Sequence, residues 1–435
     1  EGTFDQPFRS NLLFGKLSFQ PGQNQTLDLS YSGRFESDKR GFGGTTSFES
    51  AENVAIGYNV VTLSHTLSRG DWLNQAHVSA QRSTWNPTVV NDDLEIGLQY
   101  DDIIRIGARS TEQKFVQDRL AFRNDATYTG LRWLGEHVVK GGVNVDFLNY
   151  EVAKRFNGNP TFFFRPSNLD APYRVEYGEG DPGMSENNVQ FGAFLQTDWA
   201  PTSRLELNLG IRWDAETNRF NNEWVTPDSI RQQITAWNVP DSIQAVVGSD
   251  FPANYLTRGR EDRPLFLGAF QPRAGFSYDV LGTGSTVVHG GFGVYYDREI
   301  WNRLLDERFR LSWRTRNLEF TTTGEAGKVP WNPSYLSVEG LQALITQGNY
   351  GRTGELFLLN NDTRPSRTHQ FNLGVRQTLG PVVAGVAYRG VRGYNIFSWY
   401  CATPQPEHGY CGGFGGLQGL AQNYGIVASS DAGRT

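Results

Sequence analysis

The feature that most constrains this chain is a repeated pair of alternating apolar and polar runs, joined by a tight turn and followed by a long polar loop. Successive side chains of a strand point to opposite faces, so such a run predicts a strand with one apolar and one polar face. The clearest pair covers 188–200 and 205–214. Its first run places Phe191 and Leu195 on one face and Gln196 and Asp198 on the other.

The same pattern occurs six times along the chain. The predicted strand pairs are 11–20 with 26–36, 54–67 with 73–83, 114–128 with 137–150, 188–200 with 205–214, 271–280 with 286–296, and 368–379 with 382–397. Long loops are expected near 37–53, 84–112, 153–187, 216–270, 297–367 and 400–435. The loop 84–112 has room for a hairpin of its own, and 309–320 for a strand that projects outward. Everything after Trp399 is expected to be loop.

Short turns on one side and long loops on the other are typical of barrels in the bacterial outer membrane. Each predicted strand reaches or nearly reaches the ~9–11 residues that a tilted strand needs to cross a bilayer. Aromatic residues make up 13% of the chain and glycines number 49, which suits a barrel with aromatic girdles. We therefore predict an all-β fold, an antiparallel up-and-down transmembrane β-barrel with roughly twelve strands, short periplasmic turns and long extracellular loops.

Composition excludes several other classes. No apolar stretch approaches the ~20 residues of a transmembrane helix. The net charge of −6 gives no basic patch for nucleic acid. The chain has no Gly-x-Ser-x-Gly elbow, no His-Glu-x-x-His and no phosphate-binding loop, so we expect neither an enzyme nor a cofactor. A mean hydropathy of −0.48 is compatible with a barrel, because only alternate residues face lipid.

Three segments resemble the barrels of TonB-dependent receptors. They are 191–199 with 205–214 (FGAFLQTDW and LELNLGIRWD), 271–279 with 290–297 (QPRAGFSYD and GGFGVYYD), and 389–395 (RGVRGYN). The last looks like a strand end of the Oar-like subgroup, which carries a carboxypeptidase-regulatory-like domain ahead of its plug. The resemblance implies a barrel of 22 strands, of which roughly twelve amount to about half. The earlier strands fit the architecture more than any motif.

The resemblance also implies partners. A plug domain and a TonB box precede the barrel in this family; neither is found in the chain, so residues 1–435 are expected to be an internal piece of a longer receptor barrel. The implied partners are outer-membrane lipid, the plug of the full-length protein, the TonB complex and an unknown extracellular ligand. The Oar-like likeness favours a large or polymeric ligand over a siderophore. The alternatives are a passive channel, a structural or adhesion barrel, and a secreted soluble β-rich binding module.

Candidate site residues follow from their positions in the pattern. Apolar-face aromatics near strand ends are predicted to form the membrane girdle: Trp199, Trp213, Tyr278 and Tyr296. Polar-face residues are predicted to line the lumen: Glu206, Arg212, Asp214, Arg273, Asp279, Arg376 and Arg389. Outer-loop aromatics are predicted to contact ligand or, alternatively, to form small loop cores: Trp224, Trp237, Trp301, Trp313 and Trp331.

Two further features concern bonds and metals. Cys401 and Cys411 fall in one loop, and a disulfide between them is plausible in an oxidising compartment. Asn91, Asp92, Asp93 and Asp181 could bind calcium, although acidic loop residues are usually just solvated and no EF-hand spacing is present. We predict no metal site.

Overall fold

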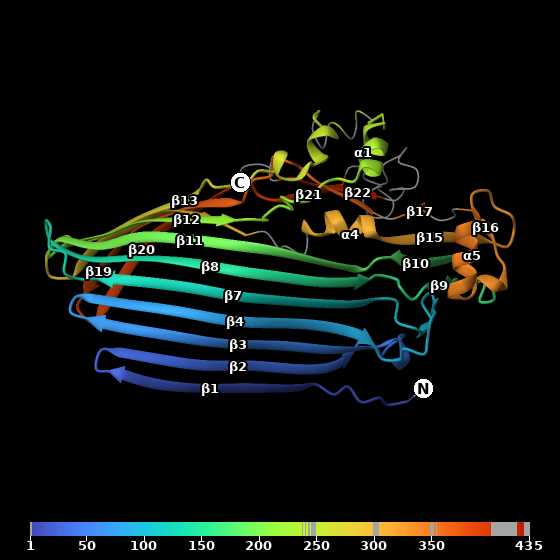
Figure 1. Cartoon of the computed structure of the whole chain (residues 1–435), viewed down its shortest axis with the longest axis horizontal. Helices are drawn as coiled ribbons and strands as arrows, with labels where there is room; N and C mark the ends of the chain where they lie inside the picture. The colour runs from blue at the N-terminus through green and yellow to red at the C-terminus, as the bar shows by residue number, and fades with distance from the viewer. Residues whose placement is uncertain are drawn as a thin grey trace.

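A twelve-stranded antiparallel sheet forms the wall of the molecule (Figure 1). The computed structural model describes residues 2–236, 238–239, 241, 244, 249–298, 304–348, 352–353, 355–401 and 424–429. Neighbours in the sheet follow one another along the chain, so the wall is an up-and-down meander. Its strands are β1 (Arg9–Gly22), β2 (Gln25–Arg40), β3 (Glu52–Arg69), β4 (Trp72–Val89), β7 (Glu112–Tyr128), β8 (Glu136–Arg155), β11 (Gly183–Thr202), β12 (Leu205–Glu216), β13 (Ala269–Asp279), β14 (Thr286–Tyr296), β19 (Arg367–Leu379) and β20 (Val382–Tyr394).

All twelve predicted wall strands are confirmed, and the six short turns lie together at one end of the sheet (Figure 1). Two of these turns need glycine, because Gly70 and Gly380 have φ of +58° and +60°. Residues with a side chain rarely adopt this left-handed conformation. The glycines therefore fix where β3 turns into β4 and where β19 turns into β20.

Several wall strands are longer than predicted and shorten the predicted loops. β4 continues to Val89, β8 continues to Arg155 and β11 begins at Gly183, so the paired backbone reaches well into 84–112 and 153–187. Apolar–polar alternation fades in these extensions, whereas cross-strand pairing continues, for example between Lys114 and Ala153. The alternation of apolar and polar residues ends with the apolar face, whereas each strand continues as far as its backbone hydrogen bonds. Alternation alone therefore underestimates the length of these strands.

None of the three buried hydrophobic clusters among the described residues contains a residue of the wall strands. Leu195, Val143 and Leu373, which lie on its apolar face, are 58%, 57% and 56% exposed. A soluble protein would bury such a continuous apolar surface, whereas a membrane barrel turns it to lipid. Within the described residues β1 and β20 each pair on one side only, so the wall is an open, partial barrel. It curls so that β19 and β20 pass behind β8 and β11 in the view of Figure 1.

The buried cores of this chain lie instead in the long loops. One group of loop strands makes a second, outer sheet: β5 (Gly97–Tyr100), β6 (Ile104–Gly107), β9 (Thr161–Phe164), β10 (Arg174–Gly180), β15 (Trp313–Thr321), β16 (Val329–Pro330) and β17 (Arg352–Thr353). A third sheet contains β18 (Glu355–Leu359), β21 (Ser398–Cys401) and β22 (Tyr424–Ser429). The helices are η1 (Phe48–Ser50), α1 (Asp228–Thr235), η2 (Ala253–Tyr255), η3 (Gly259–Glu261), α4 (Asp306–Ser312), η4 (Pro333–Tyr335) and α5 (Val338–Gly348). Among the described residues, no helix is long and apolar enough to cross a membrane.

The loops differ from the predictions at three places. The hairpin considered within 84–112 is confirmed as β5 and β6. The single strand predicted for 309–320 is wrong in its first part, because Phe309 lies in α4 and the strand β15 begins only at Trp313. The expectation of loop after Trp399 is also wrong, because β22 pairs with both β18 and β21. Short apolar runs in the loops form cores with one another, which a search for membrane alternation does not detect.

Candidate functional site

All seven residues predicted to face the lumen lie on one face of the wall, opposite the apolar face. Paired residues on neighbouring strands point to the same side. Arg273 faces Gly210 on one side and Gly293 on the other, and Arg389 faces Asn372. We call this surface the polar face; in a barrel it lines the lumen.

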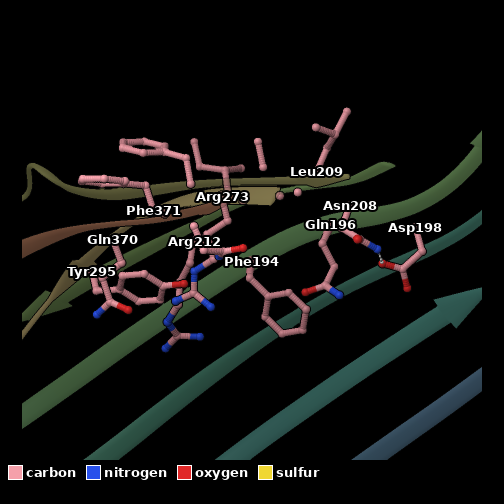
Figure 2. Close-up of a pocket in the computed structure, with 18 of the residues that line it drawn as sticks. Phe194, Gln196, Asp198, Asn208, Leu209, Arg212, Arg273, Tyr295, Gln370 and Phe371 are labelled. Atoms are coloured by element: carbon pink, nitrogen blue, oxygen red, sulfur yellow. Dashed lines mark hydrogen bonds between the residues drawn. The ribbon is translucent and has the colours of Figure 1, made fainter. Parts of the chain in front are cut away.

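The polar face contains an open depression of about 600 Å³ over β11 to β20. Figure 2 shows the side chains of Arg212, Arg273, Tyr295 and Gln370 on one side of the ribbons, with Leu209 and Phe371 on the other. The polar-face residues that line the depression are Arg123, Phe194, Gln196, Asp198, Asn208, Arg212, Arg273, Tyr295, Gln370, Asn372 and Arg389.

Glycines make the floor of this depression. Gly275 and Gly291 are directly paired across β13 and β14. A Cβ added at Gly275 would have its nearest heavy atom at 3.5 Å, and one at Gly291 at 3.4 Å, so neither position is crowded. The depression therefore exists because glycine has no side chain. The backbone itself does not require glycine at these two positions.

A chain of charged and amide groups crosses the polar face beside the depression. Arg212 is paired with Asp214 at 2.6 Å and donates to Asn144 at 3.2 Å. Asn144 in turn donates to Asp146, which is 3% exposed and paired with Arg119 at 2.9 Å. Linked charge-assisted hydrogen bonds of this kind hold the side chains in fixed positions. Three strands, β7, β8 and β12, thus share one rigid polar network.

Two arginines of the depression stand outside that network. Arg273 lies over the ring of Tyr295, with its guanidinium carbon 4.5 Å from the ring centroid. Among the described residues, neither Arg273 nor Arg389 has a carboxylate within ion-pair distance. The depression therefore offers positive charge that the described part of the wall does not neutralise, which favours a negatively charged binding partner.

Asp279 has a different local role from the other six residues. Its carboxylate accepts hydrogen bonds from the backbone N–H groups of Gly282 (3.0 Å) and Gly284 (2.7 Å). These bonds close the turn between β13 and β14, in the manner of an Asx-type turn. Asp279 therefore shapes the turn at the far end of the wall from the loops.

The four residues predicted for the girdle lie in two pairs at opposite ends of the wall. The indole N–H of Trp199 donates to the carbonyl of Leu134, in the turn between β7 and β8 (3.0 Å). Tyr278 precedes the short turn between β13 and β14 and is 40% exposed. At the loop end, Trp213 donates to Leu267 (2.9 Å) and Tyr296 to Gly268 (3.4 Å). This spacing fits two aromatic girdles, one at each interface, and the girdle role stays a prediction.

The outer sheet carries the largest buried core of the loops. It joins strands from three different loops, and its longest pairing, β10 with β15, aligns Arg174–Gly180 with Trp313–Glu319. Helix α5 packs on it through Leu341, Leu344 and Ile345. The buried residues of the cluster are Phe162, Phe164, Val175, Tyr177, Leu318, Phe320, Val329, Leu341, Leu344 and Ile345.

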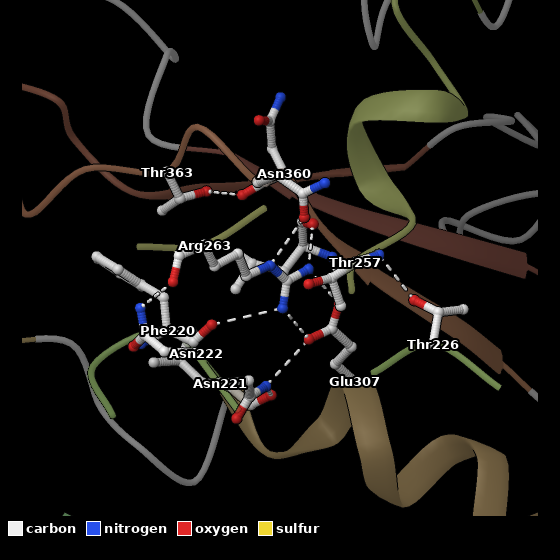
Figure 3. A network of polar contacts seen from close by, with 12 residues as sticks. Phe220, Asn221, Asn222, Thr226, Thr257, Arg263, Glu307, Asn360 and Thr363 are labelled. Carbon is white, nitrogen blue, oxygen red and sulfur yellow. Dashed lines mark hydrogen bonds and ion pairs between the residues drawn. The ribbon is translucent and has the colours of Figure 1, made fainter. Parts of the chain in front are cut away.

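A buried ion pair organises the remaining loops (Figure 3). Arg263 donates two hydrogen bonds of 2.7 Å to the carboxylate of Glu307 on α4. The same guanidinium donates to the carbonyl of Leu359 at 2.6 Å, and Glu307 accepts from Asn221 at 3.1 Å. The pair is 2% and 4% exposed, so its charges are compensated by each other and by these neighbours. Four separate loop segments meet at this point.

The outer-loop tryptophans occupy varied positions. Trp313 is 6% exposed and donates to the carbonyl of Phe156 (3.0 Å). Trp331 packs edge-on against Phe320, with ring centroids 4.9 Å apart. Both rings therefore belong to loop cores, which was the alternative interpretation, and their ligand-binding role stays an untested prediction. The guanidinium of Arg308 lies over Trp224, 5.4 Å from its centroid. Trp237 and Trp301 lie outside the described residues.

Burial and pairing shift several loop pKa values. Burial raises the pKa of Tyr173, and the hydrogen bond its hydroxyl donates to Asp101 (2.8 Å) raises it further. Burial also lowers the pKa of Arg105, with the nearby charge of Arg109 acting in the same direction. Hydrogen bonds from Arg258 lower the pKa of Asp262. The loops thus hold ionisable groups in fixed environments, as a folded surface does.

The calcium candidates are not brought into a metal site in the part of the chain that the structure describes. Asn91 accepts from the N–H of Asp93, and Asp181 accepts from the N–H of Gly183, so both side chains close local turns. The described residues contain no cluster of three or more side chains that could hold a metal ion. Cys401 is in β21, whereas Cys411 lies outside the described residues, so the disulfide stays a prediction.

Comparisons with known proteins show which proteins this chain resembles. Residues 3–429 match the family model described as an outer membrane beta barrel domain. Over 210 residues the chain is 28% identical to the TonB-dependent transporter Oar of Myxococcus xanthus, a match that covers 44% of this chain and 16% of that protein.

Two solved structures share the fold. The outer membrane transporter YddB of Escherichia coli superposes with a TM-score of 0.59 at 9% identity, covering 97% of this chain and 43% of that one. A mutant of the ferric enterobactin receptor PfeA of Pseudomonas aeruginosa superposes with a TM-score of 0.53 at 11% identity, covering 98% and 47%. The chain therefore spans less than half the length of each of these relatives.

Proposed function

Because this chain belongs to the outer membrane beta barrel domain family, we propose that it is the wall and loop region of a TonB-dependent receptor that captures a ligand at the cell surface. Membership places the chain in the outer membrane of a Gram-negative bacterium. The 28% identity to the transporter Oar over 210 residues supports TonB coupling of the whole protein. We infer that energy coupling, the plug and the ligand belong to the full-length receptor.

The observation that carries this proposal is the depression on the polar face. The depression has a glycine floor and two arginines without carboxylate partners in the described wall. Such a surface favours the binding of a folded partner that carries negative charge. We propose that an acidic part of the plug packs here in the resting receptor.

The ordered outer loops support ligand capture. Two buried clusters and the ion pair of Arg263 with Glu307 join the described parts of several loops. Pre-ordered loops lose less conformational entropy on binding than flexible ones do. We infer a large or polymeric ligand from the Oar-like motifs.

The test uses the full-length protein and needs no knowledge of the ligand. A photo-crosslinking amino acid is placed at Asn372, in the depression, and at Leu373, the next residue on the apolar face. We expect the first to give crosslinks within the same chain to the plug, and the second to give none.

A second measurement separates the receptor from the passive channel. The full-length protein is inserted in a planar bilayer and is also mixed with the purified periplasmic domain of TonB. A receptor should give no steady conductance and should bind TonB. Stepwise conductance without TonB binding would establish the passive channel instead.

A further inference from the structure

Five polar residues form one row across the apolar face of the wall. In register order across β3, β4, β7, β8 and β11, each is paired with the next: Asn59, Arg82, Asp118, Asn149 and Asn187. Arg82 forms an ion pair with Asp118 at 3.2 Å, and Asn149 donates to Asn187 at 3.0 Å. We call these five residues the polar row.

The polar row divides the outward surface into two zones. Directly below it, toward the short turns, Val61, Ala80, Leu120 and Phe147 are paired in sequence across the same strands. Above it, the outward positions include Lys114, Glu151 and Arg155. From Asp118 to Tyr128, β7 has about ten residues, which at ~3.4 Å each and a tilt of ~40° span about 25 Å. That is the height of the apolar band of an outer-membrane barrel, so the row lies at the outer lipid interface.

A groove of about 440 Å³ opens at this interface. Ala80 on β4 lies at the centre of the groove. This small residue is paired with Val61 on β3 and with Leu120 on β7, the two strands that flank β4. Val61 and Leu120 are 45% and 42% exposed, so they stand out from the wall on both sides of the alanine. Arg82 lies two residues further along the same strand and the same face. The groove is thus apolar below and carries the Arg82–Asp118 ion pair at its upper end.

From this arrangement we propose that the groove binds a lipid of the outer leaflet that carries acyl chains and a phosphorylated sugar headgroup. One acyl chain lies over Ala80 between Val61 and Leu120. The phosphate accepts hydrogen bonds from Arg82.

The polar groups of the row match this headgroup better than phosphatidylcholine, because the quaternary ammonium of choline has no N–H to donate to Asp118 or to the amides. The guanidinium of Arg82 is 58% exposed, and within the described residues only its Nη1 is engaged, which leaves further donors for phosphate oxygens. Asp118 is 39% exposed and accepts hydrogen bonds, as sugar hydroxyls require. The amides of Asn149 and Asn187 add donors and acceptors beside it. A phosphate alone would leave Asp118 facing like charge, whereas a phosphorylated sugar uses both groups.

The test measures lipid binding to the detergent-purified full-length protein by native mass spectrometry. The probe is an acylated glucosamine disaccharide with two phosphates; its dephosphorylated form and a phosphatidylcholine of equal acyl length serve as comparison lipids. We expect one copy of the phosphorylated lipid to bind, and both comparison lipids to bind at least tenfold more weakly, because a hydrogen bond to a charged group contributes about 1.5–3 kcal/mol.

Variants locate the site. Arg82→Gln should weaken binding of the phosphorylated lipid about tenfold, and Ala80→Trp should do the same by filling the groove. Arg69→Gln removes an exposed arginine on the same face of the wall at the short-turn end, and should leave binding unchanged. Heat-dependent gel mobility verifies that each variant is folded; Ala80→Leu replaces Ala80→Trp if the larger residue interferes. Equal binding by folded wild type, R82Q and A80W, or equal binding of phosphatidylcholine, would overturn the proposal.

Discussion

Arg263 and Glu307 lie 44 residues apart in the sequence, yet their side chains form a two-pronged ion pair that is almost completely buried among the outer loops. The pair joins the segment after η3 to helix α4. Each partner also bonds to Leu359 on β18, through its carbonyl and its N–H respectively. A single charged contact therefore fixes how three loop segments meet.

Breaking this pair should loosen the loops without unfolding the wall. Arg263→Met leaves a buried carboxylate without its partner, and we expect a loss of about 3–5 kcal/mol in the stability of the loop region. The double variant Arg263→Met with Glu307→Leu should regain much of that loss. Amide hydrogen exchange of Leu359 is the measurement, and the wall strand β7 is the internal control. Equal protection in wild type and the single variant would contradict the assignment.

Two glycines on the polar face should respond differently to alanine. At Gly291 the added Cβ has room, so Gly291→Ala should be neutral or stabilise by up to about 0.5–1 kcal/mol, because alanine restricts the unfolded chain. At Gly142 the Cβ would press against Asp125 and Phe194, so Gly142→Ala should cost about 1–3 kcal/mol. Denaturant unfolding in lipid vesicles compares the two. A larger loss at Gly291 than at Gly142 would mean that the depression is filled by a neighbour in the folded receptor.

Alkaline pH should release the contact between Tyr173 and Asp101. The folded-state pKa of Tyr173 is raised above its ordinary value near 10, first by burial and then by the hydrogen bond to Asp101. Its contribution to stability is therefore fully present below about pH 10 and is lost as the pH rises through the raised pKa. Hydrogen exchange in β9 and β10 should increase over that range in wild type. Tyr173→Phe removes the ionisable hydroxyl and should abolish this step.

The polar row predicts where charge is tolerated on the outward surface. Phe122→Arg lies below the row on the apolar face and should cost about 2–4 kcal/mol on folding into a bilayer. Glu151→Arg lies on the same face above the row, outside the lipid, and should change stability by less than about 1 kcal/mol. Folding titrations into vesicles give both values. If the two substitutions cost a similar free energy of folding, the lipid boundary does not lie at the polar row.

The wall was predictable because each of its strands repeats one simple constraint. Lipid on one side and water on the other impose the alternation seen in Phe191, Leu195, Gln196 and Asp198, and glycine-containing turns mark the reversals. The depression could have been noticed too, since Gly210, Gly275, Gly291 and Gly293 all fall on polar-face positions of predicted strands. The sequence alone does not show that these glycines are adjacent, because their adjacency depends on the register between the strands.

The loops were not predictable in the same way. Phe309 and Phe320 bound one segment in which apolar and polar residues largely alternate, yet the first is in a helix and the second in a strand, because each packs against partners from other loops. The pairing of Arg263 with Glu307 leaves no local signal, since neither residue has a characteristic neighbour. Contacts between segments far apart in the chain decide the loop structure, and a single sequence does not contain that information in readable form.

The pairing of β10 with β15 has a consequence for biogenesis. The wall hairpins pair neighbouring stretches of chain, so each closes only a short loop when it forms. β10 must wait, because its partner β15 follows four more wall strands, β11 to β14. Until then β10 presents an unsatisfied edge at the cell surface. Closure of the outer sheet is thus a late step of folding, because it needs two loops separated by four wall strands to be in place.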